Sequence, residues 1–278
     1  MSPLMSILIP AYGMHGNGAQ MLNRALGSIF DQELNKTLRS GGVEVVVSDH
    51  SSTGVLRKTC RESRPPSGFS LKYYVNNDGT NSASSNLNFA FSRSGGSLVK
   101  ILFQDDFLVS RRALTEVFEA FLIDDDKHWL VSGSTHTRDG LDYFGDIVPE
   151  YHDEIHLGRN TISSPSVLAV RRSAWQNFDP KLRWLLDVEV YKALHASYGP
   201  PIVLSAVHVA NGLGDHQVTA QGIPPARLLL EKVRVGSRHG PGGYAVAQIE
   251  IKALARKYAR KWTKKALSAT KHVLSQPH

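Results

Sequence analysis

Short apolar runs of strand type alternate with helical patterns along the first half of the sequence. Four runs are rich in aliphatic and β-branched side chains: residues 5–9, 43–47, 69–75 and 98–103. Three segments between or after them repeat apolar residues at the spacing of one helix face: 20–31, 81–93 and 111–123. This repeated alternation favours a Rossmann-like α/β fold, with a mostly parallel sheet flanked by helices.

Polar segments follow three of these predicted strands, at the point where each strand ends. They are Pro10–Tyr12, Ser48–Ser52 and Gln104–Asp106. In an open parallel sheet, ligands bind beyond the carboxyl ends of the strands. The three segments therefore outline one site at a single edge of the sheet.

Carboxylates stand out among these strand ends. Asp105 and Asp106 come directly after the fourth strand, and Mg²⁺ or Mn²⁺ is often held by one or two carboxylates together with substrate phosphates. A turn in which Asp105 caps the next helix is the alternative, but the position after a buried strand favours the metal site. Asp49 ends the second strand and suits ribose hydroxyls or a base N–H, while the Ser51 that follows equally suits an Asx turn.

Several short motifs follow one another in order along residues 5–220. In the first half they are Ser6–Tyr12, Val45–Asp49, Ser85–Ala90 and Phe103–Asp106. In the second half they are Ser164–Ser166, Arg171–Arg172, Phe178–Pro180, Trp184–Asp187 and His216–Gln217. Together they resemble the family-2 glycosyltransferases, which are enzymes of the GT-A fold that use nucleotide-diphosphate sugars.

The resemblance implies a specific set of site residues. Those implied to bind the nucleotide sugar are Pro10, Ala11, Tyr12, Asp49, Asn86, Gln104 and Asp105. Asp106 and His216 are implied to bind a Mn²⁺ or Mg²⁺ ion, and Asp187 to be the general base. The chain departs from the family pattern twice. His50 and Ser51 stand where the family usually has another acid and a Gly, and Gln104 stands where it often has Asp.

The implied activity is that of an inverting, metal-dependent, hexosyltransferase-like enzyme. It would move a sugar from a nucleotide-diphosphate donor, with UDP-sugars favoured, to a hydroxyl of a glycan or a lipid-linked saccharide. A positioned Asp can take the acceptor's proton during the attack, and a cation stabilises the leaving diphosphate. Glu189 lies on the same predicted helix, residues 185–197, but only Asp187 holds the family position.

Positive charge is concentrated at the C-terminal end. The formal net charge is +7, and residues 251–278 hold eight Lys or Arg and no Asp or Glu. We therefore expect a GT-A domain over 1–223 and a basic helical extension over 224–278. The extension suits three partners: an anionic membrane surface, the domain itself, or nucleic-acid phosphates. The alternative functions are a nucleic-acid or membrane-surface binding protein with a degenerate site, and a glycosyltransferase that acts on DNA.

Other chemistries fit the sequence less well. His152 and His156 are four residues apart, but Asp153 rather than Glu follows the first, which disfavours a zinc protease. The loop after the first strand contains no Lys or Arg, and no Walker motif is present, which disfavours nucleotidyltransferase and P-loop chemistry. No apolar run reaches the roughly 20 residues of a membrane span. With Cys60 as the only cysteine, we expect a cytoplasmic protein, at most peripheral at the inner face of the membrane.

Overall fold

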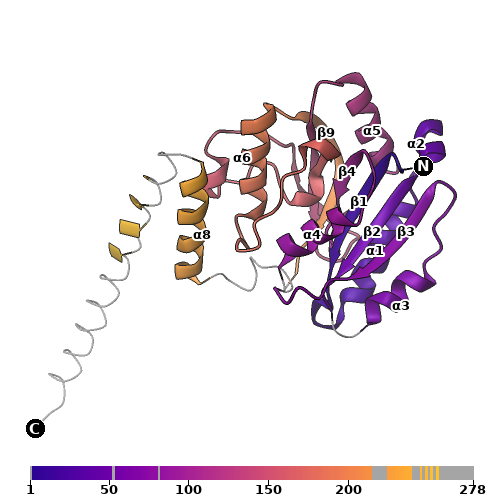
Figure 1. Ribbon diagram of the computed structural model, residues 1–278, viewed down its shortest axis with the longest axis horizontal. Coiled ribbons are helices and arrows are strands. Elements are labelled where there is room, and N and C mark those ends of the chain that lie inside the picture. Colours follow the sequence, from indigo (N-terminus) through magenta and orange to yellow (C-terminus); the bar gives the residue numbers. More distant parts are fainter. Residues whose placement is uncertain are drawn as a thin grey trace, which may run out of the picture. The chain divides into compact units, whose positions relative to one another are not determined.

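The chain divides into two compact units, Met1–Ile223 and Pro224–His278, in the computed structural model (Figure 1). The residues that the structure describes are 2–51, 54–80, 82–214 and 224–239, together with positions 245, 248, 249, 251, 252, 255 and 256. Among them, no helix is long and apolar enough to cross a membrane. His216 and most of the basic segment 251–278 lie outside the described residues.

The first unit is built on one mixed sheet. Its strands are β1 (Met5–Ala11), β2 (Val43–Asp49), β3 (Phe69–Val75), β4 (Leu98–Ile101), β5 (Phe107–Leu108), β6 (Trp129–Thr137), β7 (Tyr143–Ile147), β8 (Leu168–Arg171) and β9 (Ile202–Gly212). Its α-helices in the described ranges are α1 (Gly18–Phe30), α2 (Lys36–Gly41), α3 (Val55–Glu62), α4 (Ala83–Ser92), α5 (Ala113–Ile123) and α6 (Leu186–Tyr198). The strands lie in the order β3-β2-β1-β4-β8-β6-β9-β5, and β7 pairs with β6.

The first four strands form the parallel sheet that the sequence predicts. β1 pairs in parallel with both β2 and β4, and β2 pairs in parallel with β3. All seven residues of β1 and of β2 are buried, as expected for strands covered on both faces. α4 packs against β1 and β2, and it begins where the hydroxyl of Ser82 accepts a hydrogen bond from the backbone N–H of Ser85.

The second half of the sheet differs from the prediction. Residues 132–160 are expected as a long loop with short elements, but β6 runs through residues 129–137 in the middle of the sheet, between β8 and β9. β6 pairs antiparallel with β8 and parallel with β9, so the sheet is mixed. Its buried side chains include Ser134 and Thr135, which find hydrogen-bond partners inside the fold. A strand of this kind shows no apolar alternation, and the sequence pattern therefore misses it.

The carboxyl ends of β1 and β2 are tied together by one side chain. Ala11 and Asp49 are register partners at these ends. The amide of Asn86, on α4, donates to the carbonyl of Ala11 at 3.2 Å and to the carbonyl of Ser48 at 2.8 Å. The predicted sheet edge is thus one continuous surface, held from below by α4.

The second unit, where the structure describes it, contains helix α8 (Pro225–Arg238). The sequence predicts a short helix over 224–235. Arg227 and Glu231 lie one turn apart and form an ion pair at 3.2 Å.

Candidate active site

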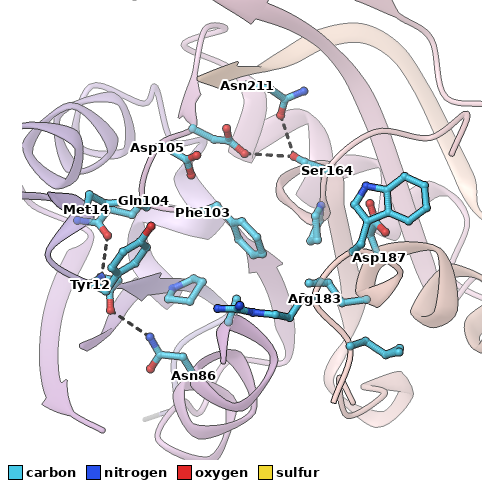
Figure 2. A pocket seen from close by; sticks show the side chains of 18 of the residues that line it. Tyr12, Met14, Asn86, Phe103, Gln104, Asp105, Ser164, Arg183, Asp187 and Asn211 are labelled. Atoms are coloured by element: carbon cyan, nitrogen blue, oxygen red, sulfur yellow. Dashed lines mark hydrogen bonds between the residues drawn. The ribbon is translucent and has the colours of Figure 1, made fainter. Parts of the chain in front are cut away.

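A pocket of about 780 Å³ opens at the carboxyl ends of β1, β2 and β4 (Figure 2). This volume is typical of a small-molecule site. Of the predicted site residues, those that line it are Pro10, Ala11, Tyr12, Asn86, Gln104, Asp105, Asp106 and Asp187. The fold therefore brings together predicted residues from four separate parts of the chain. Asp49 is not among the lining residues, and His216 is outside the described ranges.

Asp106 is the most deeply placed acid of the pocket. It is 4% exposed, and its Oδ1 accepts a hydrogen bond from the backbone N–H of Gly212 at 3.0 Å. Burial, together with the neighbouring negative charge of Asp105, raises the pKa of Asp106 to about 7. A Cβ atom at position 212 would collide with the backbone oxygen of Asp105, so the close approach of β9 to the acid pair requires Gly212.

A cluster of polar side chains behind Asp106 holds it in place. The hydroxyl oxygen of Ser164 lies 3.1 Å from Oδ2 of Asp106 and 2.7 Å from Oδ1 of Asn211 (Figure 2). The Asn211 amide donates in turn to the hydroxyl of Ser163 at 2.9 Å. Ser163 has a φ of 117°, which is disfavoured for a residue other than Gly. Tyr191 donates to the carbonyl of Ser164 at 2.9 Å, which helps to fix this strained segment.

The contacts of Gln104 give a structural reason for Gln at a position where the family-2 pattern often has Asp. Its side-chain oxygen accepts from the backbone N–H of Tyr12 at 2.8 Å, and its amide nitrogen donates to the carbonyl of Gly18 at 2.6 Å. An ionised Asp has no proton to donate to Gly18. The amide therefore fixes the shape of the loop between β1 and α1, where that loop forms the pocket wall.

Asp49 has contacts other than those predicted for it. It is fully buried, and its carboxylate accepts hydrogen bonds from the backbone N–H of Ser51 at 2.6 Å, from the Ser51 hydroxyl at 2.9 Å and from the Tyr73 hydroxyl at 2.5 Å. These are the contacts of the Asx turn that the sequence left open. Ser51 itself lines the pocket, as does His50. The role predicted for Asp49 in nucleotide binding stays a prediction.

Asp187 lies on the opposite side of the pocket from Asp105 (Figure 2). It stands in the first turn of α6, where the helix dipole favours negative charge. Its Oδ2 accepts from the Asn160 amide at 2.7 Å and its Oδ1 from the backbone N–H of Val188 at 2.7 Å. Glu189 is buried and does not line the pocket. Of the two acids considered, only Asp187 can meet a molecule in the pocket.

The acid pair fits a divalent cation that takes its other ligands from the substrate. No group of three or more His, Cys, Asp or Glu side chains that could hold a metal occurs within the described ranges. Asp105 and Asp106 supply hard oxygen ligands, and their mutual repulsion would be relieved by a bound cation. Two carboxylates, with no further ligand of this kind grouped with them in the described ranges, suit Mg²⁺ or Mn²⁺ bound together with phosphate oxygens.

The pocket lining also includes residues that the sequence analysis does not assign, among them Ser164, Arg183 and Asn211. Ser164 and Arg183 stand within or directly beside the quoted motifs, so their positions are the available signal. The sequence also predicts a strand over residues 202–209, and Asn211 comes just after it. Only the pairing of β9 with β6 places it beside Asp106.

No protein-family model and no curated protein matches the sequence. Solved structures match the fold. The structure of S. aureus TarS 1–349 in complex with UDP-GlcNAc aligns with a TM-score of 0.62 at 16% identity, over 85% of this chain and 66% of that chain. The longer S. aureus TarS structure gives a TM-score of 0.59 at 17% identity, over 85% and 39%.

The mannosyltransferase PcManGT from Pyrobaculum calidifontis, in complex with GDP-Man and Mn²⁺, aligns with a TM-score of 0.54 at 17% identity. The alignment covers 97% of this chain and 81% of that chain. The present chain spans less than two thirds of the length of either TarS structure. The likeness confirms the predicted α/β fold of the GT-A type.

Proposed function

We propose that this GT-A fold is an inverting glycosyltransferase that moves a sugar from a nucleotide-diphosphate donor to a hydroxyl group. UDP-sugars are the favoured donors, and a glycan or lipid-linked saccharide is the favoured acceptor. The observation that carries the proposal is one pocket with the Asp105–Asp106 pair on one side and Asp187 on the other. The structural neighbours with UDP-GlcNAc or with GDP-Man and Mn²⁺ support a donor of this class.

The donor would lie along the carboxyl ends of β1 and β4. Pro10, Ala11 and Tyr12 would contact the nucleotide, and Asn86 keeps the wall formed by the ends of β1 and β2 in shape. Asp49 would act through Ser51, whose hydroxyl and backbone N–H it holds. A Mg²⁺ or Mn²⁺ ion on the acid pair would offset the negative charge of the leaving diphosphate.

Asp187 would accept the proton of the acceptor hydroxyl. As the hydroxyl oxygen forms a bond to the anomeric carbon, the bond from that carbon to the diphosphate oxygen breaks. The electron pair leaves with the nucleoside diphosphate, and the proton passes to the Asp187 carboxylate. A single displacement of this kind inverts the anomeric configuration. The hydrogen bonds from Asn160 and Val188 hold the carboxylate in one orientation.

A donor-hydrolysis screen tests the proposal, because water can replace the unknown acceptor. UDP-, GDP- and dTDP-sugars are incubated with the full chain and Mn²⁺, and nucleoside diphosphate release is measured. Thermal stabilisation by the matching nucleoside diphosphate is recorded in parallel, since a ligand that binds the folded state raises its stability. We expect one nucleotide class to give both signals. A protein that neither hydrolyses any donor nor is stabilised by any nucleotide would contradict the proposal.

Metal-dependent donor binding is expected to weaken as the pH falls below about 7. The raised pKa of Asp106, about 7, means that its carboxyl group is protonated below this pH. A proton and a cation then compete for one carboxylate, so the apparent affinity falls by up to about tenfold per pH unit. UDP titrations with Mn²⁺ across this range check the slope. The Asp106→Asn variant serves as control. Any pH dependence of UDP binding that it retains comes from protonation of the ligand and not of Asp106.

The basic segment 251–278 favours the second candidate function, surface binding. Its removal leaves 24 basic against 25 acidic side chains. We expect the full chain to bind anionic vesicles, and the truncated chain to remain folded and bind donor but to lose this vesicle binding. Vesicle sedimentation at low and high salt measures this, because screening acts over about 8–10 Å at physiological ionic strength.

Loss of folding on truncation would instead make the segment part of the core. Salt-dependent binding to DNA without vesicle binding would favour nucleic acid.

A further inference from the structure

The pocket is strongly acidic, yet it has one permanently cationic side chain among its described lining residues. That residue is Arg183, and the carboxylates that line the same pocket are Asp105, Asp106 and Asp187. A nucleoside diphosphate is itself an anion, so the acidic lining alone would repel it. A cation on the Asp105–Asp106 pair offsets the charge on one side only. On the other side of the pocket, Arg183 is the lining side chain whose charge can offset that of the phosphates.

Arg183 stands four residues before Asp187, in the segment that leads into α6. Figure 2 shows its side chain extending from the Asp187 side of the pocket toward Tyr12. Electrostatics agree with this placement. Burial and the charge of Asp105 raise the pKa of Tyr12, while the guanidinium of Arg183 opposes the rise. The Tyr12 hydroxyl is thus within electrostatic reach of both Asp105 and Arg183.

Two other basic side chains, Arg24 and Lys100, make hydrogen bonds in the neighbourhood of the acid pair. Arg24 donates to the backbone oxygen of Asp105 at 2.9 Å, and its guanidinium lies 4.5 Å from the centre of the Phe107 ring. Lys100 is 1% exposed, and its ammonium donates to the carbonyls of Ile101 and Ser166. Neither side chain lines the pocket. Among the described residues that line the pocket, Arg183 is therefore the one permanently cationic side chain that a ligand can reach.

We propose that Arg183 binds the β-phosphate of the nucleotide-diphosphate donor, across the pocket from the acid pair. This inference rests on the proposed function. A guanidinium presents two parallel N–H groups that match two phosphate oxygens. The β-phosphate carries the oxygen that leaves the anomeric carbon, and Arg183 comes from the segment that ends in Asp187. Arg183 thus distinguishes a nucleoside diphosphate from a monophosphate and stabilises the charge of the leaving group.

Three variants test the assignment: Arg183→Gln, which removes the charge, Arg183→Lys, which keeps a point charge but loses the paired N–H groups, and Lys181→Gln. Lys181 is an exposed cation two residues away that does not line the pocket, so it serves as the matched control. Calorimetric titrations with UDP and with UMP, in the presence of Mn²⁺, give the ratio of the two affinities. If GDP or dTDP binds the wild type more tightly, that nucleotide and its monophosphate replace the uridine pair.

We expect Arg183→Gln to weaken UDP binding by about 10- to 100-fold, which is the range for one charge-assisted contact. UMP binding should stay close to the wild-type value. The UDP affinity of Arg183→Lys should lie between those of Arg183→Gln and the wild type. The UDP affinity of Lys181→Gln should match that of the wild type. Thermal unfolding of each variant without ligand is recorded as well, so that a loss of stability is separated from a loss of affinity.

Two results would overturn the assignment while leaving the proposed function in place. One is a wild-type ratio of UDP to UMP affinity in Arg183→Gln. The other is an equal loss for UDP and UMP, which would move the contact away from the β-phosphate. A wild-type protein that binds none of UDP, GDP and dTDP would instead overturn the proposed function, and this inference with it.

Discussion

Replacing Asp187 by Asn is expected to slow donor hydrolysis by about 10²- to 10⁴-fold while donor affinity stays close to the wild-type value. The amide cannot accept the proton of the attacking hydroxyl or water. Its carbonyl oxygen can still accept one of the two hydrogen bonds that Asn160 and Val188 donate to the carboxylate, so the start of α6 should keep its shape. Single-turnover hydrolysis of the donor found in the screen gives the rate, and calorimetry gives the affinity.

Glu189→Gln is the matched control for this prediction. Glu189 lies on the same helix, two residues away, but it is buried outside the pocket. Its variant should hydrolyse the donor at a rate near that of the wild type, once corrected for any unfolded fraction. Near-normal turnover in Asp187→Asn together with loss in Glu189→Gln would transfer the general-base role to Glu189.

Replacing Asp106 by Asn is expected to abolish the dependence of UDP binding on metal. The Asn oxygen can accept from the Gly212 N–H and the Asn amide can donate to Ser164, so the surroundings of the side chain are kept. Asp106→Ala is a poorer test, because it leaves the buried N–H of Gly212 without its acceptor, at a cost of about 1–3 kcal/mol in stability. UDP titrations with Mn²⁺ and with a chelator measure the effect.

The expected result is a variant whose UDP affinity with Mn²⁺ equals that of the wild type with the chelator. Asp126→Asn removes an exposed acid that does not line the pocket, and it should keep the full response to metal. A response to Mn²⁺ as large in Asp106→Asn as in the wild type would remove Asp106 from the metal site.

The parallel half of the sheet could be predicted because its physical signals are local. β1 and β2 are buried on both faces and read as continuous apolar runs, and the ends of parallel strands meet at one edge. The positions of Tyr12 and Asp106 at the pocket follow from this topology. The prediction of Asn86 rested on the resemblance to the family. The prediction of Asp187 rested on the resemblance, and the fold brings it to the same pocket.

The features that escaped prediction depend on contacts between distant residues. β6 is a strand because it pairs with β7, β8 and β9, and the hydroxyl groups of Ser134 and Thr135 find partners inside the fold. The pattern of its own residues does not indicate this pairing. The surroundings of Asp49 depend on Tyr73, which a neighbouring strand supplies. The place of Asn211 beside Asp106 depends on the pairing of β9 with β6. Partners of this kind are distant in the sequence, so they can be identified only from the folded structure.

The Ser164 hydroxyl has a single proton but lies within hydrogen-bond distance of two acceptors, on Asp106 and Asn211. Both contacts can be made at once only if one of the acceptors brings a proton of its own. A protonated Asp106 does so: its carboxyl group donates to Ser164, and Ser164 donates onward to Asn211. When a cation displaces that proton, the Ser164 hydroxyl can donate to only one of the two acceptors. Whether the acid pair holds a proton or a metal would therefore decide which group the Ser164 hydroxyl donates to. It would donate to Asn211 on β9 when Asp106 is protonated, and it would be free to donate to Asp106 when a cation is bound.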